Sequence, residues 1–481
     1  MMLTRVSTAA LFAALALPAH AQMALPTDVE QSCIVDGVDF DAWFKSDSPS
    51  TDGVVTAADS VGFPTDNTAC DFYKWGAQMF LWLSSPDADG LVLDSPALFN
   101  VLPAVSGKRI LQENDTGADL QFALRSEKVD DIGEVGQAGG GGALMSQAGA
   151  LVYYGVHVNE NYGYFLTGQK GEQLTQTKFP NTASDMADLE NYLNTAFPDT
   201  MLVAPETLAM EFKTAWVDAS TVPDATQFVT IPAQIPIYSA NADNTVWTKT
   251  SIETVELALV GMHIVGTVKN HPEFVWSTFE HILNAPDADY YYTNTLGDPT
   301  LQAYDSTGSF LFMETGAAAT GNVECMAETQ TGAIKAKTVD GGGLACTGGV
   351  VASNTYRKYP WGSLQNNQSA AVLSNNTDLL SINASIRSQL SNGDVRANYL
   401  QTGGIWTSPP TETAEAPIPD TDAFTASDLR GSLFAFNATM ETYQQGTSCF
   451  SCHNQAESDP NSFQPFKLSH IYSQIVPLTA K

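Results

Sequence analysis

Hydrophobic residues recur every three or four positions in several stretches of the chain, and this spacing predicts helices. The clearest stretch covers residues 70–83, where Phe72, Trp75, Met79 and Leu83 would share one buried helical face. Weaker patterns of the same kind predict helices over residues 184–197, 206–217 and 375–390, and from a Ser427-Asp428 cap to about residue 443.

Other stretches alternate between apolar and polar residues or are rich in β-branched residues, which predicts strands. Two of them cover residues 228–238 and 255–268, while residues 151–157 and 162–167 are predicted to form a hairpin. We therefore expect an α+β fold, in which a β-rich body with interspersed helices is followed by a short helical C-terminal segment.

The composition changes at residues 407–427, which are rich in proline, threonine and acidic residues. Such a composition is typical of an extended linker. It would separate a body of residues 22–406 from a C-terminal segment of residues 428–481. Because this segment is short for an independent hydrophobic core, we expect it to pack on the body.

The first 21 residues contain the three parts of a bacterial export signal. Arg5 supplies the positive charge, residues 9–17 form a short apolar run, and Ala19-His20-Ala21 matches a cleavage site. We expect the mature chain to begin near Gln22, in the periplasm or outside the cell. No later apolar stretch reaches the roughly 20 residues of a membrane-spanning helix, so we expect no transmembrane anchor in the mature chain.

The charge balance narrows the kinds of partner that the protein can have. The 481 residues include 21 Lys and Arg against 53 Asp and Glu, a formal net charge of −32. Nucleic-acid phosphates require a basic face, so no nucleic-acid partner is expected. A charged protein partner is expected to be basic, and the acidic surface would steer its approach.

Near the C-terminus, Cys449-Phe450-Ser451-Cys452-His453 is a C-x-x-C-H motif, the attachment sequence of c-type haem. Two cysteines one helical turn apart can each add to a vinyl group of the same porphyrin, and His453 then binds the iron as the proximal ligand. A thioredoxin-like site would need a βαβ context, and a zinc site would need further ligands at a matching spacing. We therefore expect one covalent haem c per chain.

The other four cysteines are expected to form structural disulfides, because an exported protein folds in an oxidising compartment. They are Cys33, Cys70, Cys325 and Cys346. The sequence-local pairing joins Cys33 to Cys70 and Cys325 to Cys346, but the sequence alone leaves the two other pairings open.

The sixth iron ligand decides between an electron carrier and a haem enzyme. The 28 residues after His453 contain no methionine, so the usual ligand of a small class I cytochrome is missing. His470 is the first candidate distal ligand, because it lies next to an apolar helical face formed by Leu468, Ile471 and Ile475.

Other side chains are weaker candidates for the distal side of the haem. Met440 lies in the predicted helix before the motif, where its position on the apolar face favours a role in the core. His263, Glu280 and His281 belong to the body and are possible distal-side residues. An imidazole from any of these positions is chemically able to bind iron.

Five segments of the chain resemble a family of uncharacterised exported bacterial monohaem proteins, the "cytochrome c family" proteins with a C-terminal C-x-x-C-H. The resemblance covers residues 70–86, 206–216, 259–287, 395–406 and 437–453, which are spread over most of the mature chain. It implies a c-type haem near the C-terminus and implies no particular substrate.

These patterns lead to functional hypotheses from different classes. In an exported electron-transfer protein, a six-coordinate haem would exchange electrons with a redox partner protein. Alternatively, an open sixth position would bind peroxide or a gas beside a distal acid or base, or the body would bind a ligand with the haem as an accessory. An electron carrier is favoured over a catalyst because the sequence contains no G-x-S-x-G, no H-E-x-x-H and no second haem motif.

Overall fold

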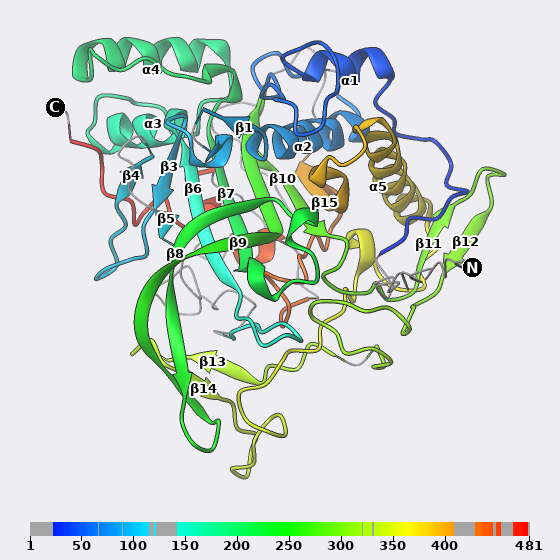
Figure 1. The fold of residues 1–481 in the computed structure, drawn as a ribbon. Helices are drawn as coiled ribbons and strands as arrows, with labels where there is room; N and C mark the ends of the chain where they lie inside the picture. Colours follow the sequence, from blue (N-terminus) through cyan, green and yellow to red (C-terminus); the bar gives the residue numbers. More distant parts are fainter. Residues whose placement is uncertain are drawn as a thin grey trace, which may run out of the picture.

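An antiparallel β-sheet runs through the middle of the molecule, and helices lie on both of its faces (Figure 1). This computed structural model describes residues 23–65, 67–88, 90–114, 120–121, 142–319, 321–329, 331–407, 429–445, 449–453 and 465–479. The predicted export signal and nearly all of the predicted linker lie outside these ranges.

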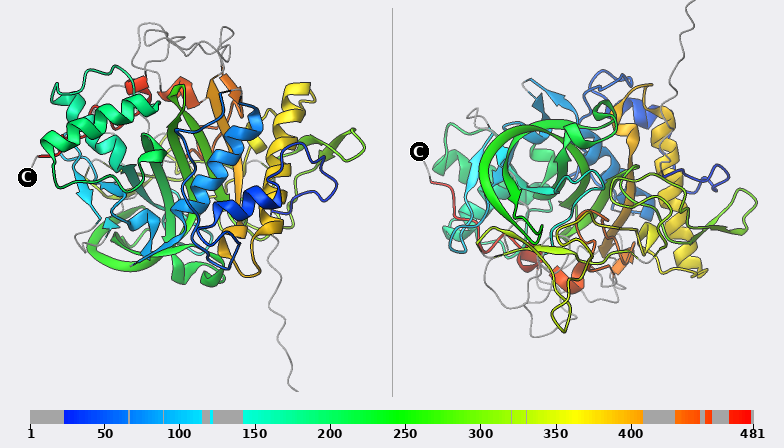
Figure 2. Two further views of the ribbon diagram at one scale, coloured as in Figure 1. Left: turned by 90° about the horizontal axis from the view of Figure 1, so that it is seen from above. Right: turned by 60° about the horizontal axis from the view of Figure 1, so that its bottom comes forward.

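Along its main path the sheet has the strand order β16-β15-β10-β9-β7-β6-β3-β4. The strands of this path are β3 (Leu98–Val101), β4 (Leu111–Glu113), β6 (Tyr153–Asn159), β7 (Met210–Asp218), β9 (Val246–Val268), β10 (His271–His281), β15 (Tyr399–Thr407) and β16 (Leu429–Gly431). Strand β8 (Thr230–Ala240) pairs with the first half of β9 and forms a long curved arm (Figure 2).

Shorter strands attach to this framework or form separate hairpins. They are β1 (Pro86–Asp87), β2 (Gly90–Leu91), β5 (Leu120–Gln121), β11 (Tyr290–Thr293), β12 (Pro299–Gln302), β13 (Met326–Glu328) and β14 (Ile334–Ala336). Strand β14 pairs with the outer part of β9, and β11 pairs only with β12 among the described strands.

The helices flank the sheet. They are α1 (Gly37–Trp43), α2 (Ala69–Leu83), α3 (Glu160–Lys170), α4 (Ala183–Ala196), α5 (Ala370–Gln389), α6 (Cys449–His453) and α7 (Pro465–Leu468). The 3₁₀ turns are η1 (Val92–Asp94), η2 (Pro205–Thr207), η3 (Ala219–Thr221), η4 (Ala225–Gln227), η5 (Pro360–Gly362) and η6 (Val395–Asn398). Within the described ranges, none of these helices has the length and apolar character to cross a membrane.

The two faces of the sheet build separate hydrophobic layers, because successive side chains of a strand point to opposite sides. On one face, Phe279 of β10 stacks on Phe80 of α2 with ring centroids 4.5 Å apart. On the other face, Trp276 of the same strand packs near Phe450 of α6, with ring centroids 5.7 Å apart. Strand β10 is therefore buried along its whole length.

The predicted β-rich α+β fold is confirmed. Helices α2, α4 and α5 match the helices predicted over residues 70–83, 184–197 and 375–390. Their starts have a local cause, as at Ser369, whose Oγ accepts a hydrogen bond from the Val372 amide and caps α5. The strands predicted over residues 228–238 and 255–268 are β8 and β9.

Three predicted elements are wrong. Residues 206–217 form mostly strand β7 rather than a helix, because β7 lies between β6 and β9 and forms hydrogen bonds to both. Residues 162–167 belong to helix α3 rather than to a strand, because the Asn159 side chain accepts from the Tyr162 amide and caps the helix. Residues 429–443 are not helical, since β16 pairs with the end of β15 and turns follow it.

The four cysteines that were expected to form disulfides do so, and the structure selects the sequence-local pairing from the three that the sequence left open. Cys33 is bonded to Cys70, which ties the N-terminal region to the start of α2. Cys325 is bonded to Cys346 and closes the loop that carries β13 and β14. Loops of these lengths make each disulfide worth about 3 kcal/mol in the chain-entropy model. Such bonds persist in oxidising compartments.

The segment before the C-x-x-C-H motif packs directly on the sheet. The Asn437 side-chain amide donates to the Phe279 carbonyl at 2.9 Å, and the Tyr154 hydroxyl donates to the Thr439 carbonyl at 2.6 Å. Beneath this segment, strand β9 carries Gly261. A Cβ at Gly261 would lie only 2.5 Å from the Thr439 Oγ1 and 2.9 Å from the Asn437 Nδ2. The absence of a side chain therefore allows the segment to approach the sheet closely.

We expect Gly261→Ala to destabilise the protein by about 1–3 kcal/mol, because the added methyl group displaces two buried polar side chains. Thermal unfolding of the oxidised protein measures this as a lowered Tm. Gly37→Ala is the matched control, because a Cβ there meets only the end of Gln389 at 3.7 Å. Equal Tm values for the two variants would contradict the explanation that the missing side chain of Gly261 lets the segment approach the sheet.

Candidate functional site

The five residues of the C-x-x-C-H motif form the short helix α6, which lies against the face of the sheet that carries Trp276. Phe450 is buried there, while Cys449 is half-buried with its Sγ 3.9 Å from the Ala435 carbonyl oxygen. The Trp276 ring meets the His453 imidazole edge-on, with centroids 4.3 Å apart. The side chain of Cys452 lies outside the described part of the structure.

The imidazole of His453 is oriented by the C-terminal tail. Its Nδ1 donates a hydrogen bond to the Leu468 carbonyl oxygen at 2.7 Å. A neutral imidazole that carries its proton on Nδ1 has its lone pair on Nε2, the nitrogen that a proximal haem histidine uses. A backbone carbonyl on the other ring nitrogen is a common partner of metal-binding histidines.

The tail itself is held in place by the body. The Ser469 hydroxyl donates to the Glu211 carboxylate at 2.5 Å and lies 2.8 Å from the Tyr162 hydroxyl. Lys170 of α3 donates to the carbonyl oxygens of Tyr472 and Ile475 at 2.6 and 2.7 Å. These contacts fix the position of the Leu468 carbonyl, and through it the orientation of His453.

His470, the first candidate for the distal ligand, lies beside His453. The geometry of the two rings differs from that of two ligands on opposite sides of one iron ion. The two imidazole rings are stacked face to face, with centroids 3.6 Å apart and an angle of 1° between the planes. Two imidazoles on opposite sides of one metal ion are separated by two metal–nitrogen bonds of about 2 Å each, so their centroids lie more than about 4 Å apart. The tail therefore stacks the His470 ring on the face of the His453 ring.

A cavity opens beside the motif, with about 530 Å³ of space between atoms, part of it open to solvent. The sheet contributes His263, Trp276 and Thr278, while the C-terminal segment contributes Glu441, Cys449 and His453 along with Ala435, Phe436 and Gln444. Residues separated by nearly 200 positions in the sequence thus meet at one site.

The lining of the cavity includes a hydrogen-bonded pair formed by His263 and Glu441. The His263 Nε2 lies 3.0 and 2.9 Å from the two carboxylate oxygens of Glu441. Burial would raise the pKa of Glu441, but His263, together with Lys213 and the Asn437 amide, lowers it to about 2. Glu441 is therefore a carboxylate at neutral pH.

The residues around the cavity fit a c-type haem. The Trp276 indole nitrogen is buried and finds no hydrogen-bond partner among the described residues, so a donor is available at the wall for an acidic group such as a haem propionate. The proximal imidazole already has the required tautomer. In the described ranges, no cluster of three or more His, Cys, Asp and Glu side chains is arranged to hold a bare metal ion.

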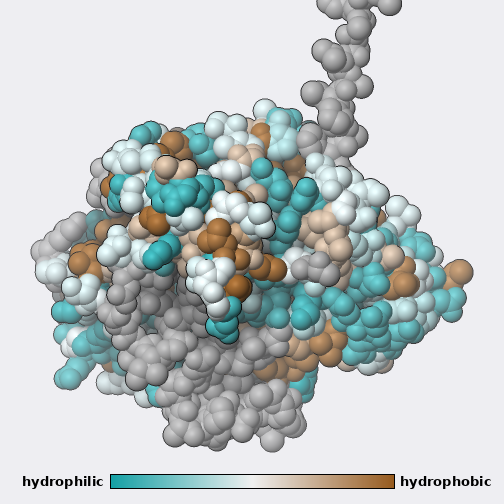
Figure 3. Space-filling view, turned by 90° about the horizontal axis from the view of Figure 1, so that it is seen from below, coloured by the Kyte–Doolittle hydropathy of each residue, from teal (hydrophilic) through white to brown (hydrophobic). Residues whose placement is uncertain are grey.

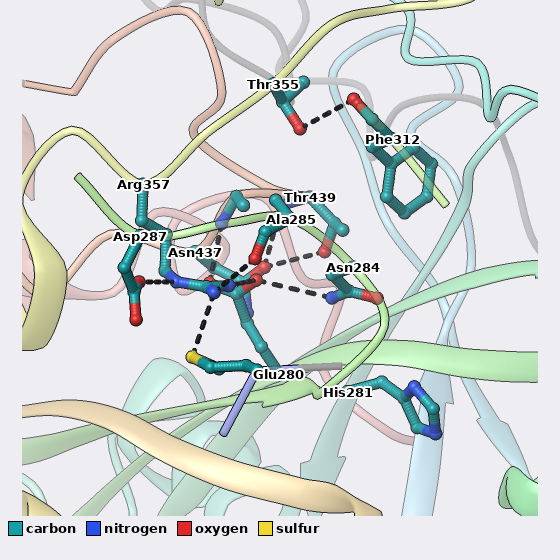
Figure 4. A network of polar contacts seen from close by, with 12 residues as sticks. Glu280, His281, Asn284, Ala285, Asp287, Phe312, Thr355, Arg357, Asn437 and Thr439 are labelled. Atoms are coloured by element: carbon teal, nitrogen blue, oxygen red, sulfur yellow. Dashed lines mark hydrogen bonds and ion pairs between the residues drawn. The ribbon is translucent and has the colours of Figure 1, made fainter. Parts of the chain in front are cut away.

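Glu280 is part of a buried network and does not line the cavity (Figure 4). Its carboxylate accepts hydrogen bonds from Arg357 at 2.9 Å and from the Ala438 amide at 2.9 Å. Arg357 also donates to Asp287 and to the Ala285 carbonyl oxygen, both at 2.5 Å. Glu280 therefore anchors the segment before the motif.

His281 and Met440 also lie away from the cavity. His281 stacks on Phe228 at 3.8 Å, and its ring nitrogens contact the Gln227 carbonyl and the Leu283 amide. Burial lowers the pKa of His281 to about 3, so its imidazole stays neutral. Met440 is 1% exposed, packs in the hydrophobic core and is not among the residues that line the cavity. Of the body residues named from the sequence, the structure brings only His263 to the site.

Three residues of the site were not identified from the sequence. Glu441 and Trp276 acquire their roles from pairing across the fold, and Leu468 contributes only its backbone carbonyl. In the sequence, Glu441 is an acidic residue after a methionine and Trp276 is an aromatic residue in an apolar stretch, and both situations are common. No local signal distinguishes them.

In the variant Arg357→Met, the carboxyl groups of Glu280 and Asp287 stay buried and lose their cation. We expect the free energy of unfolding at pH 7 to fall by about 3–5 kcal/mol, the usual cost of breaking a buried ion pair. Burial already raises the pKa of both carboxyl groups, and loss of the guanidinium raises them further. The folded variant then binds more protons than the unfolded chain.

Its unfolding free energy should therefore increase as the pH falls from 7 to 5, and the deficit relative to the native protein should narrow. Denaturant unfolding at several pH values measures the deficit. Arg430→Met, at an exposed position, is the control. A deficit that stays constant over this pH range would show that the two carboxyl groups are not the origin of the loss.

Comparison with known proteins adds no relative: no family model, no curated protein and no solved structure matches this chain. The evidence for a function therefore comes from the motif and from the geometry around it.

Proposed function

We propose that this protein is an exported monohaem c-type cytochrome that transfers electrons. The observation that carries the proposal is the position of the C-x-x-C-H motif. The Leu468 carbonyl holds the Nδ1 of His453, and His453 and Cys449 line the same cavity. The export pattern of residues 1–21 and the two disulfides support placement in the periplasm or outside the cell.

Each residue of the site has a defined role in this proposal. Cys449 and Cys452 would hold the haem through two thioether bonds, each made by adding a thiol S–H across one vinyl group, with the sulfur on one carbon and the proton on the other. His453 would bind the iron through Nε2, and the Trp276 indole would donate a hydrogen bond from the cavity wall. When bound, the haem supplies an iron that exchanges one electron between its ferrous and ferric states.

The partner in this proposal is a redox protein with a basic docking face. The net charge of −32 gives the chain a strongly acidic surface, which would steer such a partner and make association sensitive to salt. On the lower face in Figure 3, described hydrophobic residues lie in small groups among hydrophilic ones. Interfaces of transient complexes have this mixed character.

The cavity itself favours a second candidate, a haem protein with an open sixth position that binds peroxide or a gas. Carbon monoxide separates the two functions, because it binds ferrous haem only where the sixth position is open or its ligand is displaced. A reduced spectrum that carbon monoxide leaves unchanged supports the electron carrier.

The exported protein, produced with a c-type haem attachment system, should show a c-type visible spectrum and keep its haem through denaturing electrophoresis. Cys449→Ser/Cys452→Ser should lose all covalent haem, because both thioether bonds are removed. Cys325→Ser/Cys346→Ser is the control, since it also removes two cysteines but leaves the site intact. A native protein without covalent haem, exported under these conditions, would refute the proposed function.

A further inference from the structure

We infer that His263 supplies the sixth iron ligand of the proposed haem and that Glu441 holds the other nitrogen of its ring. This inference rests on the proposed function and assigns a residue that the motif alone leaves open. It also replaces His470, which the spacing of the sequence put first. Three observations support it: the position of His263, its contact with Glu441, and the location of the competing side chains.

The position of His263 follows from the sheet register. His263 of β9 pairs with Thr278 of β10 on one side and with Lys213 of β7 on the other. Residues paired across antiparallel strands point to the same face, and Thr278 lies two residues from Trp276 on that face. Because Trp276 contacts His453, the side chain of His263 faces the same cavity as the proximal imidazole.

The contact with Glu441 gives His263 the environment of a metal-binding histidine. The His263 Nε2 donates to the Glu441 carboxylate, and one of these oxygens also accepts from the Asn437 amide at 3.1 Å. With its proton on Nε2, the ring has its lone pair on Nδ1. A carboxylate on the second ring nitrogen orients a metal-bound imidazole and makes it a stronger ligand.

The competing side chains lie elsewhere. Among the described residues that line the cavity, the side chains suited to binding iron are His263, Cys449 and His453, and the last two belong to the attachment motif. His470 stacks on the face of the His453 ring. Met440 is buried in the hydrophobic core, His281 is buried against Phe228, and neither lines the cavity.

Two histidine ligands have consequences for the function. A six-coordinate haem with two imidazoles holds no exogenous substrate at the iron, which favours electron transfer over peroxide or gas binding. Its reduction potential is expected to be lower than that of a haem with histidine and methionine ligands. The body of the protein then has a chemical role, because it carries the distal ligand on its central sheet.

The test compares His263→Ala with His470→Ala in the full-length exported holoprotein. The native protein should be low-spin when oxidised and reduced, and carbon monoxide should leave its spectrum unchanged. His263→Ala should become high-spin and bind carbon monoxide readily, and added imidazole should restore the low-spin spectrum. His470→Ala should remain low-spin, because the His470 ring stacks on the face of the His453 ring.

Glu441→Gln keeps the assignment testable even where His263→Ala fails to fold. This variant should remain low-spin, but its reduction potential should rise. The negative charge of the native carboxylate stabilises the ferric state, and the amide of the variant lacks this charge. A high-spin His470→Ala beside a low-spin His263→Ala would overturn the inference, as would a native protein that binds carbon monoxide readily. A native protein without covalent haem would instead reject the proposed function on which the inference rests.

Discussion

The burial of strand β10 on both faces is the constraint on which the rest of the structure depends. The strand lies between β9 and β15, so its backbone hydrogen bonds are made to both sides, and its side chains contribute to two separate layers. Phe279 packs on the helix layer and Trp276 packs on the motif helix. A slip of one residue in register would exchange these faces and bring the polar groups of the site under helix α2. The register therefore positions the site.

Buried charge beneath the C-terminal segment fixes where that segment meets the sheet. Arg357 joins Glu280 and Asp287 in the interior, and Glu280 accepts from the Ala438 amide directly above it. A buried ion pair adds little net stability, because desolvation offsets most of its attraction, but a segment that misses its partners leaves charges uncompensated. The network therefore selects one position for the residues that lead into the motif.

The site shows how a fold can supply what a short motif lacks. In the proposed function the C-x-x-C-H sequence provides attachment chemistry and one ligand, while orientation and the rest of the cavity lining come from elements that lie far away in the chain. Leu468 orients His453, Trp276 packs against its ring, and His263 and Glu441 line the same cavity. In a cofactor protein, these contributions of geometry and electrostatics are the protein's own share of the chemistry.

Part of this protein was predictable because the responsible interactions are local. Helix α2 follows from the spacing of Phe72, Trp75 and Met79, and the disulfides follow the nearest pairing of cysteines. Residues 206–217 and 429–443 were mispredicted because their backbones pair with strands that are distant in sequence, and this pairing outweighs local helical spacing.

Composition and spacing within a few residues were enough to identify the C-x-x-C-H motif and the excess of acidic residues, and to predict the β-rich α+β class and the four disulfide cysteines. The side chains that surround the motif could be found only from the folded chain. His263 meets Glu441 across 178 positions of sequence, and His470 stacks on His453 instead of facing it. Such contacts depend on strand register and on the path of the tail, which arise from the packing of the whole chain.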